Sequence, residues 1–149
     1  MQNKRNEKLL LFDYDGTLVD SAQMIIEGTV EAFNRCGLTI PEPEEIKAGI
    51  GQKLDIAIRS YLPLEHKGTL DEVIRQYRQW YMEKDLEGTQ FEPLFENIKP
   101  VLEKLYQDGW QLGIATNKSL RGLNRGLRHH GIKKFFSITS ITLLVSSKS

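Results

Sequence analysis

Apolar and polar positions along the chain predict a short buried strand followed by a helical segment. The run Lys8–Tyr14 is almost continuously apolar and bounded by charge, which is typical of a buried parallel strand. Apolar residues then recur at helical spacing, which predicts helices over Ser21–Arg35, Leu54–Leu62 and Thr69–Asp85. The first part of the chain is therefore one strand and a long helical insert.

Local signals refine this insert. Pro41 and Pro43 indicate a connection between helices. Thr69 followed three residues later by Glu72 predicts a capping box at the start of the last helix. That helix is expected to pack through one apolar face, formed by Val73, Tyr77, Trp80 and Tyr81.

The second part of the chain alternates helix and strand. We expect a helix over Ile98–Gln107, a buried strand over Trp110–Ala115, a helix over Ser119–His130 and a third strand over Phe135–Val145. The inward residues of the first of these helices are expected to be Val101, Leu102 and Leu105.

This order of elements predicts an α/β fold with a Rossmann-like, three-layer core around a parallel sheet. Residues 1–20 and 89–149 would form the core, and residues 21–88 an inserted α-helical cap.

Composition agrees with a folded globular protein. The 149 residues are 40% hydrophobic and 27% charged, which excludes a wholly disordered or collagen-like chain. Cys36 is the single cysteine, so no internal disulfide can form. The apolar run Leu9–Phe12 is too short for a signal-peptide core or a membrane span. We therefore expect a cytoplasmic protein that is a monomer or a weak dimer.

The formal net charge of zero conceals a division. Residues 1–108 carry 13 basic and 20 acidic side chains, a net −7, whereas residues 109–149 carry 7 basic side chains and no carboxylate. A polyanion-binding surface is one interpretation, but little aromatic interleaving favours an ordinary solvated face. No nucleic-acid or membrane partner is expected.

Candidate chemistry lies where the first strand ends. Asp13 and Asp15 flank one residue there, and Gly16 allows a turn that re-aims the second carboxylate. Gly16 and Thr17 present N–H groups and a hydroxyl that could hold phosphate oxygens. One carboxylate could attack phosphorus while the other moves a proton, and Mg²⁺ would relieve their repulsion. The alternative is a common Asp-Gly turn after a strand.

The segment Asp13-Tyr14-Asp15-Gly16-Thr17 resembles the first motif of the haloacid dehalogenase superfamily, in particular its phosphoglycolate phosphatase branch. The resemblance implies that Asp13 is the nucleophile and Asp15 the general acid and base. It also implies that the Asp13 carboxylate and the Asp15 carbonyl bind Mg²⁺. A carboxylate at position 15 argues against the branch that cleaves carbon–halogen bonds.

A second motif of that family is a hydroxyl residue at the end of the second core strand, which Thr116 matches. By the resemblance Thr116, with Asn117 and Lys118 beside it, would bind the phosphoryl group. For Thr116 taken alone, the alternative is an ordinary strand-end residue or a helix cap.

The insert resembles the type 1 cap of the family, and Ala48–Leu54 resembles its substrate-facing loop; a simple helix–helix turn is equally compatible. Asn97 stands where relatives often have glycine, and it can adopt the left-handed conformation. His129 and His130 are interpreted as a helix end rather than metal ligands.

The resemblance weakens after about Phe136. Lys148 lies where the family's third-motif lysine is expected, but a terminal lysine is the alternative, and Lys133 and Lys134 precede the third strand. No acidic residue follows Asp108, so the acidic fourth motif that completes the Mg²⁺ site has no counterpart. Truncation or a changed reading frame would explain this. We expect an exposed first strand, weaker Mg²⁺ binding and low activity.

The leading hypothesis is a Mg²⁺-dependent phosphatase for a small phosphorylated metabolite, phosphoglycolate-like by resemblance. The alternatives are a sugar-phosphate mutase of the same family and a catalytically impaired or inactive fragment. A phosphoacceptor receiver domain is disfavoured by the long insert and by Gly16-Thr17.

Overall fold

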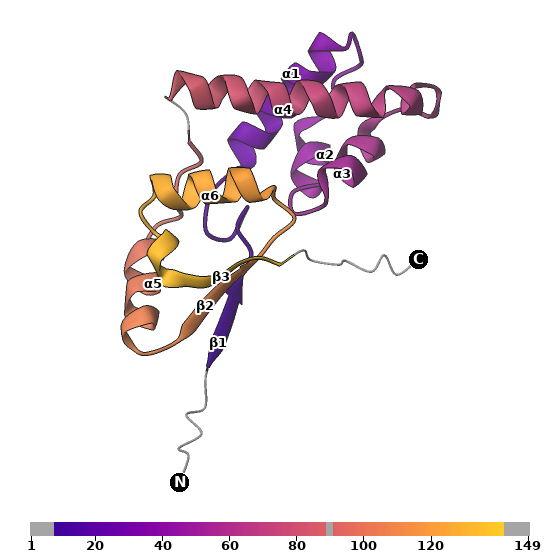
Figure 1. The fold of residues 1–149 in the computed structure, drawn as a ribbon. Coiled ribbons are helices and arrows are strands. Elements are labelled where there is room, and N and C mark those ends of the chain that lie inside the picture. Colours follow the sequence, from indigo (N-terminus) through magenta and orange to yellow (C-terminus); the bar gives the residue numbers. More distant parts are fainter. Residues whose placement is uncertain (1–7, 89–90, 142–149) are drawn as a thin grey trace. The chain divides into compact units, whose positions relative to one another are not determined.

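A computed structural model describes residues 8–88 and 91–141 of the chain. The chain divides into two compact units (Figure 1). Met1–Asp20 and Pro93–Ser149 form the first, which we call the core unit, and Ser21–Glu92 form the second, the helical unit. Across the described residues, no helix is both long enough and apolar enough to cross a membrane.

The core unit contains the parallel sheet that the hydrophobic pattern predicts. Strands β1 (Leu9–Phe12), β2 (Gln111–Ala115) and β3 (Phe136–Ile141) lie in the order β1-β2-β3, with β1 parallel to β2 and β2 parallel to β3. Among the described strands β1 is therefore an edge, as expected, and its Leu9 and Leu11 are 45% and 50% exposed. The expected Rossmann-like parallel sheet is confirmed.

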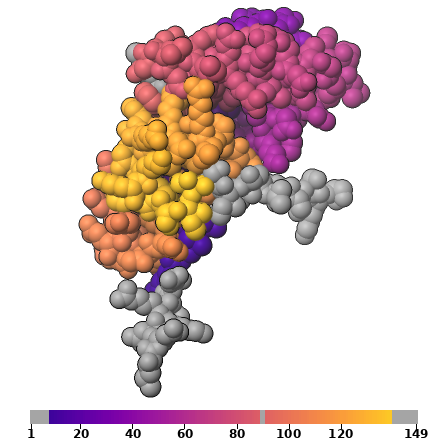
Figure 2. Space-filling view, viewed as in Figure 1, coloured from indigo at the N-terminus to yellow at the C-terminus, as the bar shows by residue number. Residues whose placement is uncertain are grey.

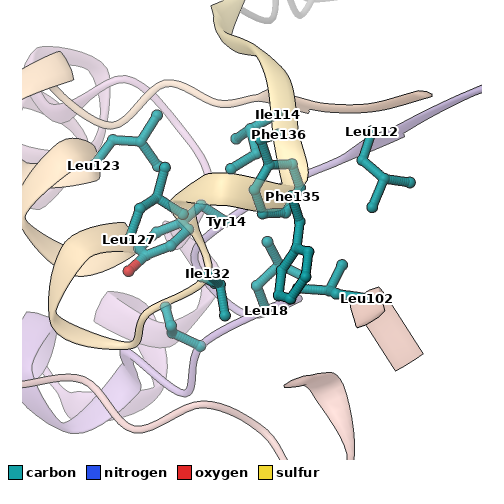
Figure 3. Packing of buried hydrophobic residues seen from close by; sticks show 11 residues of the cluster. Tyr14, Leu18, Leu102, Leu112, Ile114, Leu123, Leu127, Ile132, Phe135 and Phe136 are labelled. Atoms are coloured by element: carbon teal, nitrogen blue, oxygen red, sulfur yellow. The ribbon is translucent and has the colours of Figure 1, made fainter. Parts of the chain in front are cut away.

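Two helices of the core unit cover one face of this sheet. Helices α5 (Ile98–Gln107) and α6 (Leu120–His129) pack over it, and a short 3-10 helix, Lys133–Phe135, leads into β3. The apolar cluster between helices and sheet is shown in Figure 3; its buried members include Leu102, Leu112, Ile114, Leu123 and Leu127. The expectation that Val101 points inward is wrong, because Val101 is 48% exposed while the neighbouring Leu102 faces the cluster.

The described part of the helical unit contains four α-helices. These are α1 (Ala22–Arg35), α2 (Pro43–Ala48), α3 (Leu54–Tyr61) and α4 (Leu70–Glu87), with a 3-10 helix, Leu64–Thr69, before α4. Its apolar cluster lies between α1, α3 and α4 and includes Ala32, Phe33, Ile58, Leu62 and Val73. Figure 2 shows α4 at the surface of the helical unit. Its exposed residues include Asp71, Glu72, Arg75 and Arg78.

The predicted apolar face of α4 is confirmed. Val73 and Trp80 are buried, and the Tyr81 ring contacts those of Tyr77 and Trp80 at centroid distances of 4.9 Å and 5.1 Å. These side chains pack inside the helical unit, as a structural face rather than a ligand site would.

The predicted capping box at Thr69 is wrong. The Thr69 hydroxyl donates to the His66 carbonyl, and the Glu72 carboxylate accepts from Arg75 and Gln76 instead. The reason is that the preceding 3-10 helix runs directly into α4, so Thr69 does not stand at a free helix start.

A capping box occurs instead in the segment expected to be a simple connection. Helix α2 begins with Pro43 as its first residue, and Glu42 and Glu45 exchange side-chain and backbone hydrogen bonds. Proline fits the first turn of a helix because its missing N–H has no partner there in any case. The prolines at 41 and 43 therefore introduce a helix rather than only a connection.

Candidate active site

Asp13 follows β1 directly at the carboxyl end of the sheet. Its side chain is half-buried, and its Oδ1 accepts a hydrogen bond of 2.7 Å from the Tyr14 N–H. In parallel sheets this end of the strands is where ligands bind. The position therefore combines an accessible carboxylate with a fixed backbone.

A tight turn places the second carboxylate. Gly16 has a φ of 78°, as its predicted turn role requires, and its N–H donates to the Val19 carbonyl at 2.9 Å. The Thr17 N–H donates to the Tyr14 carbonyl at 3.3 Å. Both N–H groups that were expected to hold phosphate are thus used inside the turn. In this conformation, the phosphate-binding group left to the turn is the hydroxyl of the exposed Thr17.

The turn is tied to the start of α5. Val19 pairs with Leu94 in an antiparallel bridge, and the Phe95 N–H donates to the Leu18 carbonyl at 3.0 Å. Asn97 then adopts a φ of 64°, which confirms the predicted left-handed residue. The backbone on both sides of the candidate site is therefore hydrogen-bonded within the core unit.

Tyr14 lies between Asp13 and Asp15 in the sequence and ties this segment to the apolar cluster of the core unit. Its side chain is completely buried, and Figure 3 shows its ring within the apolar cluster beside Leu127. The ring reaches Gly126 on α6 so closely that a Cβ added there would lie 1.9 Å from the Tyr14 hydroxyl oxygen. Sequence reasoning missed this contact, although a glycine inside a helical pattern was a signal of close packing.

The loop after β2 supplies hydroxyl groups, whereas the turn after β1 supplies carboxylates. Thr116 is buried, and its Oγ1 accepts from the Lys118 N–H at 3.1 Å. Ser119 caps α6 by accepting from the Gly122 N–H at 3.2 Å. Ser119, not Thr116, is therefore the cap of α6, while Thr116 binds a loop N–H at the strand end and its hydroxyl hydrogen is a further donor.

Lys118 joins the two strand ends. Its Nζ lies 3.4 Å from Asp15 Oδ1, and the side chains of Lys118 and Asp15 are only 15% and 14% exposed. Asn117 is half-buried between Thr116 and Lys118. The structure thus brings the β1 turn and the β2 loop together through a direct contact between Asp15 and Lys118.

The remaining sequence candidates are Lys148, two lysines near β3 and two neighbouring histidines. Lys148 lies outside the described residues, while Lys133 and Lys134 belong to the 3-10 helix before β3. His129 ends α6 and His130 is its C-cap, as predicted. Within residues 8–88 and 91–141, no group of three or more His, Cys, Asp or Glu side chains is placed to hold a metal ion.

The expected substrate-facing loop, Ala48–Leu54, links α2 to the start of α3 as a turn in the helical unit. Gly51 there has a φ of 93°, and a Cβ at Gly49 would lie 2.0 Å from the Tyr61 hydroxyl oxygen. The positive φ of Gly51 and the close approach of Tyr61 to Gly49 account for these two glycines locally, so the substrate role of the loop stays a prediction.

Comparison with known proteins decides the family. The sequence profile of the haloacid dehalogenase-like hydrolases matches residues 10–148, nearly the whole chain. The chain belongs to this family. A solved haloacid dehalogenase-like family hydrolase from Streptococcus pneumoniae superposes with a TM-score of 0.76 at 25% identity, covering 96% of this chain and 63% of that one.

Two curated relatives have different activities in their names. The tyrosine-protein kinase PtkA of Mycobacterium tuberculosis is 33% identical over 131 residues, which cover 88% of this chain and 43% of that protein. A phosphoglycolate phosphatase from Vibrio parahaemolyticus is 29% identical over 136 residues, which cover 87% of this chain and 58% of that protein. The chain thus spans about half the length of these relatives.

Proposed function

We propose that this chain is a Mg²⁺-dependent phosphatase that hydrolyses a small, phosphoglycolate-like phosphomonoester through an aspartyl-phosphate intermediate. One observation carries the proposal: Asp13 follows β1 directly, and the turn at Gly16 brings Asp15 to Lys118 at the end of the neighbouring strand. The site combines an attacking carboxylate with a second, positioned carboxylate.

In the first step an Asp13 carboxylate oxygen attacks phosphorus, and the bond from phosphorus to the ester oxygen breaks. Asp15 gives its proton to the leaving oxygen, so the alcohol departs neutral. In the second step Asp15 accepts a proton from water while the water oxygen attacks phosphorus. Inorganic phosphate leaves and the Asp13 carboxylate is restored.

The end of β2 would hold the phosphoryl oxygens during both steps. The Thr116 hydroxyl and the Asn117 amide come from the β2 loop, and the Thr17 hydroxyl comes from the β1 turn. These neutral donors can stabilise the charge that develops on phosphorus without adding a second attacking group.

Mg²⁺ is often held by one or two carboxylates together with waters and the substrate phosphate. The half-exposed Asp13 carboxylate and the Asp15 main-chain carbonyl fit that limited donor set, and they would hold the ion. When bound, Mg²⁺ would neutralise phosphate charge and polarise the phosphoryl group. Because residues 109–149 offer no further carboxylate, we expect weak Mg²⁺ affinity.

The test is hydrolysis of phosphoglycolate and of p-nitrophenyl phosphate in the presence of Mg²⁺ by the chain and by Asp13→Asn. We expect turnover that falls by at least about a thousandfold in the variant, because amide nitrogen cannot replace the attacking oxygen. Asp20→Asn, at an exposed carboxylate that follows the turn, is the matched control and should keep full activity. Equal rates for the chain and Asp13→Asn would exclude this mechanism.

Phosphoryl transfer to a protein tyrosine is the second candidate, which the 33% identity with the kinase PtkA supports. An aspartyl phosphate can pass to a hydroxyl group as well as to water, and the mutase alternative uses a sugar hydroxyl in the same way. Incubation with ATP and a tyrosine peptide, or with a sugar phosphate, separates these cases by product. A chain that binds phosphate without any turnover would be the inactive fragment. We keep a cytoplasmic location and a small-molecule partner as part of the proposal.

A further inference from the structure

The contact between Lys118 and Asp15 defines a role for Lys118 that differs from phosphate binding. The two residues are 103 positions apart in sequence, yet Nζ and Oδ1 lie 3.4 Å apart. Both side chains are largely buried, with exposed fractions of 15% for Lys118 and 14% for Asp15. A carboxylate removed from water to this extent needs a partner charge nearby, and Lys118 supplies it.

The rest of the Lys118 side chain is also held in place. Its Nζ lies 5.7 Å from the centroid of the Tyr14 ring, within the range of a cation–π contact. Its Cε lies 3.3 Å from the position that a Cβ would take at Gly122, so the stem runs along the first turn of α6. Its N–H is bound by Thr116. Backbone, stem and ammonium group are therefore all fixed.

This fixation favours a positioning role. If the ammonium moved away from Asp15 to bind a phosphoryl oxygen, it would leave that largely buried carboxylate less compensated. In its present place the ammonium contacts the Asp15 carboxylate and lies over the Tyr14 ring. We propose that Lys118 is a positioning residue that fixes the Asp15 carboxylate for proton transfer and is not a ligand of the phosphoryl group. This inference rests on the proposed phosphatase function.

The first test is a double-mutant cycle of Lys118→Met and Asp15→Asn, assayed on phosphoglycolate with Mg²⁺. We expect Lys118→Met to lower kcat by about ten- to a hundredfold, which is part of the rate enhancement that a general acid provides. KM should stay within about twofold of that of the unmodified chain. In the Asp15→Asn background the same change should have no further effect. A Lys118→Met effect of equal size in both backgrounds would overturn the proposal.

Two variants complete the series. Lys118→Arg keeps the positive charge and should recover most of kcat, and it also reports on the role if Lys118→Met does not fold. Lys134→Met is the matched control, because Lys134 also lies over an aromatic ring, 5.2 Å from the centroid of Phe135, but outside the site. It should leave kcat and KM unchanged. A rise in KM for Lys118→Arg without a change in kcat would contradict the positioning role.

Binding of inorganic phosphate separates this inference from the proposed function. If the unmodified chain shows no turnover, the phosphatase proposal fails, and phosphate affinity measured by ³¹P NMR still tests Lys118. An affinity within about twofold of the unmodified chain in Lys118→Met supports the positioning role. A loss of about tenfold or more, equivalent to about 1.4 kcal/mol, would make Lys118 a phosphate ligand and overturn it.

Discussion

Each unit of the molecule has a helix glycine that packs directly against an aromatic side chain, but the two contacts differ in closeness and in consequence. In the core unit a Cβ at Gly126 would lie 1.9 Å from the Tyr14 hydroxyl oxygen and 3.0 Å from Cζ. In the helical unit a Cβ at Gly28 would lie 3.0 Å from Trp80 Cε3 and 3.2 Å from Tyr77 Cε2. The contact at Gly126 leaves no room for a Cβ, whereas a Cβ at Gly28 would need only a small shift of the aromatic rings.

The residues on the far side of each contact explain the difference. Tyr14 lies between Asp13 and Asp15, so the packing of α6 against its ring also fixes the two carboxylates of the candidate site. Trp80 lies in the middle of α4 and joins α4 to α1. The same kind of contact therefore positions chemistry in the core unit and holds helices together in the helical unit.

Among these predictions, Gly126→Ala should have the largest effect on stability and activity. We expect the free energy of unfolding to fall by about 1–3 kcal/mol through overpacking against a fully buried ring, and kcat to fall with it. Urea denaturation and the phosphoglycolate assay measure the two effects. The double variant Tyr14→Phe/Gly126→Ala should regain part of the stability, because it removes the oxygen nearest the new Cβ. A Gly126→Ala chain as stable and active as the unmodified one would refute the positioning by α6.

Gly28→Ala is the matched change in the helical unit and should have a smaller effect. Alanine favours a helix over glycine by about 1 kcal/mol, which offsets much of the cost of moving the Trp80 ring by a few tenths of an ångström. We expect the free energy of unfolding to change by less than about 1 kcal/mol and kcat and KM to stay the same. A loss of activity with unchanged stability would show that Trp80 also serves the site.

Asn97→Ala sharpens the comparison at the backbone of the core unit. Asn97 has a φ of 64°, and an alanine there costs about 1 kcal/mol relative to residues that tolerate the left-handed conformation. Asn97→Gly should keep or slightly raise the stability measured by urea denaturation. If alanine and glycine at this position behave alike, the left-handed conformation does not persist in solution.

The smallest effect is expected at the surface of the helical unit. Hydrogen bonds from Arg75 and, to a smaller extent, Gln76 lower the pKa of the Glu72 carboxylate from its ordinary 4.5 to about 2. The lowered value in the folded chain means that this contribution is present above pH 4.5 and is lost as the pH falls toward 2. The Tm difference between the unmodified chain and Glu72→Gln should therefore shrink over that range. In an Arg75→Met background, the Tm difference should lose most of this pH dependence. An unchanged pH dependence would show that Arg75 is not the cause of the lowered Glu72 pKa.

Local patterns were sufficient to predict much of this molecule. Helix α5 has the predicted bounds, and the turn at Gly16 and the left-handed Asn97 follow from the conformations that these residue types allow. The sequence does not predict helix α2, because Pro41 and Pro43 favour a connection, although Glu42 and Glu45 stand at capping-box spacing.

The contacts that define the site could not be predicted locally. Lys118 and Asp15 are 103 positions apart, and Tyr14 meets Gly126 across an even longer separation. Such pairs depend on how β2 and α6 pack against the β1 turn, which no short window of sequence contains. The motifs therefore indicate which residues are candidates for the chemistry. Only the fold shows which contacts hold those residues in place.

Identification of the phosphorylated side chain tests the central claim most directly. The chain would be mixed with phosphoglycolate and Mg²⁺ and quenched in acid, and its acyl phosphates reduced with borohydride, which converts aspartyl phosphate to homoserine. Peptide mass spectrometry then locates the product. We predict homoserine at position 13 and unmodified Asp15. Homoserine at position 15, or hydrolysis without homoserine at either position, would contradict the account.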